Sequence, residues 1–200
     1  MKGKLVSAGL ALLMALPVAT QAADLKRAEE IVGGRCFLCH GMEGEAASAL
    51  YPRLAGQHAE YIAKQLADFK SGKRKSDTMS GMVTDLTTDE MKALGAFFEQ
   101  KKPSHSGHTD ADLAAVGRYI FTKGNQYSGV ASCTSCHGPK GYGTPQLPRL
   151  AGQQPLYLEN QLKQFNTRER NNDNAVMHSI ASKLTELEVK AVSSYISTLE

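Results

Sequence analysis

The stretch Cys36-Phe37-Leu38-Cys39-His40 and its counterpart Cys133-Thr134-Ser135-Cys136-His137 contain all four cysteines of this 200-residue chain. On a helical turn, residues at i, i+3 and i+4 lie on one side, so both cysteines and the histidine share a face. Cys-x-x-Cys-His is the attachment sequence for c-type haem, in which the cysteines form thioethers and the histidine binds iron. The sequence therefore predicts one covalently bound haem c at each motif, two in all.

Three other kinds of site use paired cysteines. A thioredoxin-like redox pair requires a βαβ context, and the sequence shows none. Two structural disulfides would not require a histidine directly after the second cysteine in both motifs. A shared four-cysteine zinc site would take half its ligands from each motif and leave both histidines unexplained. Haem is therefore the preferred interpretation, with zinc and disulfide bonds as the alternatives.

Other segments recur at almost the same interval as the cysteine motifs. The hexapeptide PRLAGQ occurs at residues 52–57 and again at residues 148–153, 96 positions later, whereas the cysteine motifs are 97 apart. A Tyr-x-x-x-Gln-Leu-x-x-Phe pattern begins at Tyr61 and Tyr157, and Leu-Thr-x-x-Glu begins at Leu86 and Leu184. A constant order at a nearly constant offset indicates a tandem duplication of a whole domain.

Each repeat is expected to be helical, which makes the fold class all-α. Apolar residues ahead of the cysteines follow helical spacing, and Thr87-x-x-Glu90 and Thr185-x-x-Glu188 are capping boxes that open the final helices. We expect a first domain over residues 24–102 and a second over residues 103–200, with a linker near residues 101–110. The apolar spacing rests on these residues: Leu25, Ala28, Val32, Leu113, Val116 and Ile120.

The first 23 residues have the pattern of a secretory signal peptide. Lys2 and Lys4 precede an apolar run, and small residues follow up to Ala23. We expect cleavage after Ala22 or Ala23 and export of the remaining chain.

Charge gives no argument for a nucleic-acid partner. The 23 Lys and Arg residues, two of them in the leader, nearly balance the 20 Asp and Glu residues. The local basic run Lys73-Arg74-Lys75 is interpreted as a solvated loop.

A haem iron with one histidine has a second axial position, and the duplication indicates what fills it. Met79 lies seven residues before Leu86, and Met177 lies seven residues before Leu184. Met82 and Met91 have no methionine at the matching positions of the second repeat. We therefore expect His40 and Met79 to be the axial ligands of the first iron, and His137 and Met177 those of the second. Met82 is the main competitor for the first haem.

Taken together, these motifs resemble those of the dihaem cytochrome c4 family over essentially the whole chain after the leader. The resemblance implies two class I cytochrome c domains related by a pseudo-twofold axis, and an electron carrier of the periplasm rather than an enzyme. It implies a monomer, at most loosely associated with the membrane, that exchanges electrons with redox partner proteins. The donor would be a cytochrome bc complex or another reductant, and the acceptor a terminal oxidase. A long segment before the second motif, residues 124–132, is less typical of this fold.

The resemblance also suggests a role for PRLAGQ. Class I cytochromes commonly use a proline carbonyl to accept a hydrogen bond from Nδ1 of the axial histidine, which orients the imidazole. Pro52 and Pro148 are the candidates for this role, and Arg53 and Arg149 are the candidates for pairing with haem propionates. The alternative for the hexapeptide is that it only shapes the turn into the next helix.

Two other functions remain as alternatives. A dihaem peroxidase needs one vacant or displaceable axial position, and a haem-based sensor needs a linked output module. A methionine at both matched positions favours electron transfer over a peroxidase.

Overall fold

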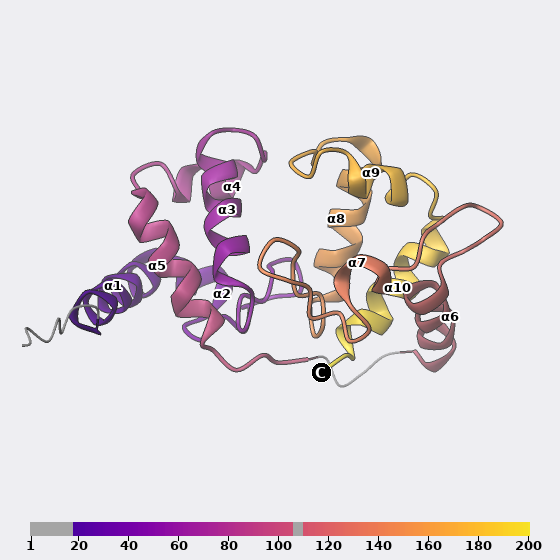
Figure 1. Cartoon of the computed structure of the whole chain (residues 1–200), viewed down its shortest axis with the longest axis horizontal. Helices are drawn as coiled ribbons and strands as arrows, with labels where there is room; N and C mark the ends of the chain where they lie inside the picture. The colour runs from indigo at the N-terminus through magenta and orange to yellow at the C-terminus, as the bar shows by residue number, and fades with distance from the viewer. Residues whose placement is uncertain (1–17, 106–109) are drawn as a thin grey trace, which may run out of the picture.

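The computed structural model describes residues 18–105 and 110–200, with side chains from Asp24 onward. Most of the predicted leader, residues 1–23, lies outside the described residues, and the predicted cleavage positions fall within the first helix. The described chain forms two helical units that lie side by side (Figure 1). It contains no regular β-strand, only an isolated antiparallel bridge between Asn125 and Val130, and no described helix is long and apolar enough to cross a membrane.

The elements follow the predicted duplication. The first unit comprises α1 (Val18–Ile31), the π-helical segment η1 (Val32–Cys36), α2 (Phe37–His40), α3 (Ala59–Lys70), α4 (Asp77–Met82) and α5 (Thr88–Glu99). The second comprises α6 (Ala111–Lys123), α7 (Thr134–His137), α8 (Pro155–Thr167), α9 (Val176–Ala181) and α10 (Glu186–Ser197). The all-α prediction is confirmed.

Both capping boxes form as predicted. The Thr87 hydroxyl accepts from the backbone N–H of Glu90, whose carboxylate accepts from the backbone N–H of Thr87. Thr185 and Glu188 repeat the arrangement at the start of α10. Each box satisfies two backbone donors at a helix end, which fixes where α5 and α10 begin.

The first unit has an apolar core in which α1 and α3 both pack against α5. Ala28 and Ile31 of α1, with Val32 at the start of η1, form one buried face, and Leu94 and Phe98 of α5 lie in the same cluster. This face has the predicted helical periodicity, because residues at i, i+3 and i+4 lie on one side of a helix.

The second unit has a smaller core, a cluster of five buried residues: Ile120, Phe121, Leu158, Val192 and Ile196. The buried face of α6 consists of Gly117, Ile120 and Phe121, whereas Val116 is 41% exposed. The apolar spacing that includes Val116 predicted a helix, which forms as α6, but Val116 itself lies outside the buried face. A Cβ on Gly117 would lie 2.0 Å from the carbonyl oxygen of Ala191, so the close crossing of α6 and α10 requires glycine here and turns Val116 outward.

The extra segment before the second cysteine motif is a loop anchored to α10. Asn125 and Val130 exchange backbone hydrogen bonds of 2.9 Å, and Asn125 Nδ2 donates to Glu188 Oε1 at 2.7 Å. In the first unit, the corresponding link between the first helix and the cysteine motif is the five-residue segment η1, which ends at Cys36. The insertion therefore closes on itself and leaves the following motif helical.

The two PRLAGQ segments bind each other across the interface between the units. The Gln57 amide accepts from the Arg149 N–H at 2.8 Å and donates to the Arg149 carbonyl at 2.9 Å. Gln153 makes the same two contacts with the backbone of Arg53, at 2.8 and 2.9 Å. This reciprocal pairing is what a pseudo-twofold axis requires, and it accounts for the occurrence of the hexapeptide in both domains.

Gln57→Ala should weaken the association of the two units. The substitution removes two hydrogen bonds and leaves the Arg149 N–H without its acceptor, which costs about 1–3 kcal/mol when the group is buried. We expect the denaturant midpoint of the haem-loaded protein to fall and the radius of gyration to rise in small-angle scattering. Gln153→Ala should behave alike, and the exposed Gln126→Ala is the control. If Gln57→Ala matches Gln126→Ala in both measurements, the pairing does not hold the units together.

Candidate haem-binding sites

Each Cys-x-x-Cys-His motif ends in a four-residue helix, α2 in the first unit and α7 in the second. Gly41 and Gly138 follow the histidines with φ of 77° and 79°, which turns the chain away from the helix. The four cysteines are free thiols, so the disulfide alternative is not realised. Within the described residues no three His, Cys, Asp or Glu side chains converge as a metal site.

The two histidines are oriented by proline carbonyls. Nδ1 of His40 lies 3.0 Å from the carbonyl oxygen of Pro52, and Nδ1 of His137 lies 3.1 Å from that of Pro148. Because the carbonyl can only accept, Nδ1 carries the proton and Nε2 is left with its lone pair. Burial lowers the pKa of both histidines, against the opposing effect of the proline carbonyl. Each imidazole is therefore neutral and has one nitrogen available for a metal.

The prolines are held in place by the rest of their hexapeptides. The N–H groups of Leu54 and Ala55 both donate to the carbonyl of Gly44, at 2.8 and 3.1 Å. Leu150 and Ala151 repeat this with Gly141, at 2.7 and 3.0 Å. The loop after each histidine and the loop carrying the proline are thus tied together.

Replacing Pro52 or Pro148 with Ala should preserve haem attachment. The backbone carbonyl remains, and the surrounding hydrogen bonds come from neighbouring residues, so the haem potential should move only modestly. Redox titration and haem quantification of the purified variants measure both effects. Complete loss of haem would mean that the proline ring shapes the loop rather than only presenting an oxygen.

The predicted methionine ligands occupy matching positions. Met79 lies in α4, is half-buried and packs against the first core, and Met177 lies in α9. A polar side chain accepts a hydrogen bond from the backbone N–H of each methionine: Ser76 Oγ from Met79 at 3.2 Å, and Asp173 Oδ2 from Met177 at 2.5 Å. Met82 is 42% exposed.

The two hexapeptide arginines lie at the interface. Arg53 donates from Nη1 to the carbonyl of Gly152, and the Arg149 guanidinium stacks over the Tyr142 ring at 4.4 Å. Nε of Arg149 is buried and has no hydrogen-bond partner among the described residues. A buried donor without an acceptor fits a binding site for an anionic group that the polypeptide does not supply. Together with the free thiols and the oriented imidazoles, this makes the donor set suitable for haem c.

The interpretation of Lys73-Arg74-Lys75 as a solvated loop was wrong for Arg74, which is only 7% exposed. Arg74 and its counterpart Arg170 are both buried between the units, where they bond to residues of α3 and α8. Sequence reasoning missed both residues. Their spacing of 96 positions, the same as that of Tyr61 and Tyr157, was the signal that could have found them.

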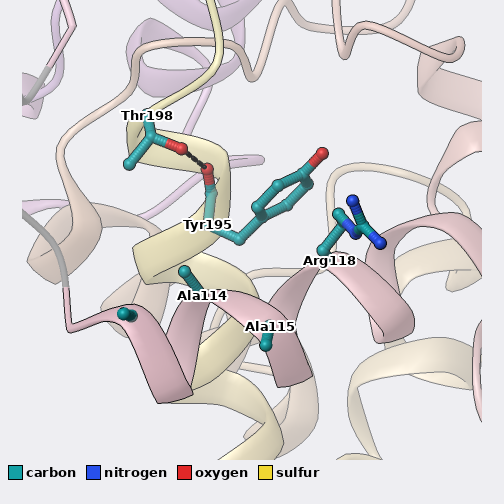
Figure 2. A pocket seen from close by; sticks show the side chains of 6 residues that line it. Ala114, Ala115, Arg118, Tyr195 and Thr198 are labelled. Carbon is teal, nitrogen blue, oxygen red and sulfur yellow. Dashed lines mark hydrogen bonds between the residues drawn. The ribbon is translucent and has the colours of Figure 1, made fainter.

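A shallow recess between α6 and α10 is lined by other kinds of residue than the haem sites. Figure 2 shows Ala114, Ala115 and Arg118 of α6 facing Tyr195 of α10, where Thr198 donates to the Tyr195 carbonyl at 2.8 Å. No cysteine, histidine or methionine lines it, so it is not part of either haem site.

Comparison with known proteins agrees with this geometry. The cytochrome c family model matches twice, over residues 25–122 and 121–200. Cytochrome c4 of Pseudomonas aeruginosa is 39% identical over 168 residues, covering 82% of this chain and 83% of that protein. A thiosulfate dehydrogenase electron acceptor of Stutzerimonas stutzeri is 35% identical over 202 residues, covering 96% and 93%. The crystal structure of reduced recombinant cytochrome c4 from Pseudomonas stutzeri superimposes with a TM-score of 0.83 at 34% identity, covering 88% and 98%.

Two tandem cytochrome c domains, each with a Cys-x-x-Cys-His motif and an oriented histidine, define a c-type cytochrome with two covalently bound haem c groups. The chain belongs to the cytochrome c4 family, and it is an electron-transfer protein that works with redox partner proteins.

Proposed function

We propose that this dihaem cytochrome is a periplasmic electron carrier in which both irons are ligated by one histidine and one methionine. The observation that carries the proposal is the matched placement of Met79 and Met177, each in a short helix between the helix that follows PRLAGQ and the final helix. Thioether sulfur is a soft neutral ligand that raises haem potential. The haem supplies one-electron chemistry, and the protein attaches it, orients its axial histidine and provides the second ligand.

The remaining roles at each site follow the same duplication. Cys36, Cys39, Cys133 and Cys136 form the thioethers, and the carbonyls of Pro52 and Pro148 orient the histidines. Arg53 and Arg149 pair with haem propionates, which is supported by the buried Nε of Arg149. With both axial positions filled by protein ligands, neither iron has a free site for peroxide or a gas.

For the partners, we propose a cytochrome bc complex or another reductant as donor and a terminal oxidase as acceptor. A second candidate donor is thiosulfate dehydrogenase, because a relative that matches over 96% of this chain is named as its electron acceptor. The domain boundaries at residues 24–102 and 103–200 and the leader over residues 1–23 belong to the same proposal.

Stopped-flow mixing of the purified haem-loaded protein tests the partners. Reduced protein should be oxidised rapidly by a membrane preparation rich in terminal oxidase, and oxidised protein should be reduced by a cytochrome bc complex. Reduction by thiosulfate dehydrogenase and thiosulfate, with no reduction by the cytochrome bc complex, would favour the second candidate donor. Consumption of peroxide by the isolated protein, or binding of carbon monoxide without loss of a ligand, would contradict a six-coordinate carrier.

A further inference from the structure

The side chains of Arg74 and Arg170 are each buried against the opposite domain. Arg74 is 7% and Arg170 6% exposed. Arg74 Nη2 donates to Tyr157 OH at 3.1 Å and to Gln161 Oε1 at 2.8 Å, both in α8. Arg170 Nη2 donates to Tyr61 OH at 2.9 Å and to Gln65 Oε1 at 3.2 Å, both in α3. These six residues are called the arginine cluster below. In Figure 1, α3 and α8 lie on the sides of the two units that face each other.

The cluster is nearly symmetric and holds both guanidinium groups in place. Gln65 Oε1 also accepts from Arg74 Nη1 at 2.8 Å, and Gln161 Oε1 also accepts from Arg170 Nη1 at 2.6 Å, so the two cations share two acceptors. Each guanidinium additionally stacks on a phenylalanine of its own domain, Phe69 or Phe165, at 4.5 Å from the ring centre. Two like charges are thus brought close together in a buried interface.

No carboxylate in the described chain forms a hydrogen bond with either guanidinium. Asp68 Oδ2 accepts from Lys64 Nζ at 2.5 Å and from Asn172 Nδ2 at 2.6 Å. Asp173 Oδ2 accepts from the Met177 N–H, and Asp173 influences Arg170 only through space. A buried charge is costly unless an opposite charge pairs with it. Both guanidinium groups donate only to neutral acceptors, and Asp173, the carboxylate that acts on Arg170 through space, has one oxygen without a hydrogen-bond partner but bonds to neither arginine. The cluster can therefore pair with a further anion.

The arginine cluster also contains hydrogen-bond donors that have no acceptor within it. A guanidinium can donate five hydrogen bonds; Arg74 makes three and Arg170 makes four. The hydroxyl oxygens of Tyr61 and Tyr157 accept from the arginines, so their own protons are available to another acceptor. This arrangement suits carboxylate groups, which only accept hydrogen bonds and pair strongly with guanidinium.

We propose that the arginine cluster binds propionate carboxylates of both haems, so that Arg74 and Arg170 each act on the haem of the other domain as well as on their own. This assigns a haem-binding role to residues outside the PRLAGQ segments. It depends on the presence of two covalent haems and not on which methionine ligates the iron.

The proposal has an electrostatic consequence that spans both domains. A positive charge in a region of low dielectric destabilises the ferric state of a nearby haem and so raises its potential. The other charged or titratable groups around the cluster are Lys64, Asp68, Asp173, Tyr61 and Tyr157, and a substitution of either arginine leaves them in place. Removal of one guanidinium should therefore lower both potentials.

The test uses the haem-loaded protein with Arg74→Gln, Arg74→Lys and the control Lys73→Gln, which removes the same charge from the adjacent exposed position. The two midpoint potentials are measured by redox titration, with the haems distinguished by NMR. Infrared difference spectra of protein with ¹³C-labelled propionates report directly on the carboxylates. We expect Arg74→Gln to lower both potentials and shift the propionate bands, Arg74→Lys to keep most of the potential but shift the bands, and Lys73→Gln to change neither.

Propionate bands in Arg74→Gln that are indistinguishable from those in Lys73→Gln would overturn the proposal. A fall confined to the first haem would overturn the cross-domain part of it. If Arg74→Gln does not retain two haems, Arg74→Lys decides the matter, because it preserves the charge and loses the forked geometry. Unchanged propionate bands in Arg74→Lys would then count against the cluster as a propionate site.

Discussion

Met79→Ala should convert the first haem to a weakly ligated, partly high-spin centre with a lower potential, and leave the second haem almost unchanged. The substitution removes the thioether that stabilises ferrous iron, and axial ligands set haem potentials over about 0.8 V. Water or another weak ligand would then occupy the vacated position. The second iron keeps His137 and Met177, because both come from its own domain. Optical spectra and a redox titration that resolves two steps measure these changes.

Met82→Ala is the matched control for this prediction. Met82 lies in the same short helix but is 42% exposed, so its loss should change stability by about 0.5 kcal/mol and leave the spectrum intact. If Met82→Ala abolishes the methionine–iron signal of the first haem and Met79→Ala preserves it, the assignment based on the repeat offset is wrong.

Replacing Cys133 and Cys136 together with Ala should reduce covalent haem from two groups to one and destabilise the second domain. Its apolar cluster has only five buried residues, against twelve in the first domain. A domain of this size with so small a core depends on the haem to complete it. Mass spectrometry counts the haem adducts, and circular dichroism measures the loss of helix.

The double variant Cys36→Ala/Cys39→Ala is the matched control, because it makes the same change in the first domain. It should also leave one covalent haem, but with a smaller loss of helical signal, because the first domain retains its larger cluster. Equal losses in the two double variants would show that core size does not determine how much each domain depends on its haem. Retention of two covalent haems in either variant would contradict the attachment sites themselves.

Much of the architecture could be predicted because local sequence determines it. The capping boxes at Thr87 and Thr185 depend on residues three positions apart, and the duplication could be read from matched motifs at offsets of 96 to 98. Helical periodicity identified the buried face of α1. It did not identify the buried face of α6, because the close approach of Gly117 to Ala191 determines which face is buried, and that contact lies far away in the sequence.

The contacts between domains were the least predictable part of the sites. Arg74 lies in a basic run, and nothing in the neighbouring residues indicates that Tyr157 and Gln161 cover it. Likewise, the glutamine that ends PRLAGQ gives no sign that its partner is the backbone of the other copy. Burial of a charge is a tertiary property. The sequence indicated a shared role for Arg74 and Arg170 only because they are 96 positions apart, as Tyr61 and Tyr157 are.

The most direct test of two His/Met-ligated haems is the proton NMR spectrum of the fully reduced protein. A methionine methyl bound to ferrous haem resonates far upfield, because the ring current of the porphyrin shields it. The account predicts two such methyl resonances, one lost in Met79→Ala and the other lost in Met177→Ala. A single resonance or none in the unmodified protein, or loss of both in one variant, would contradict it.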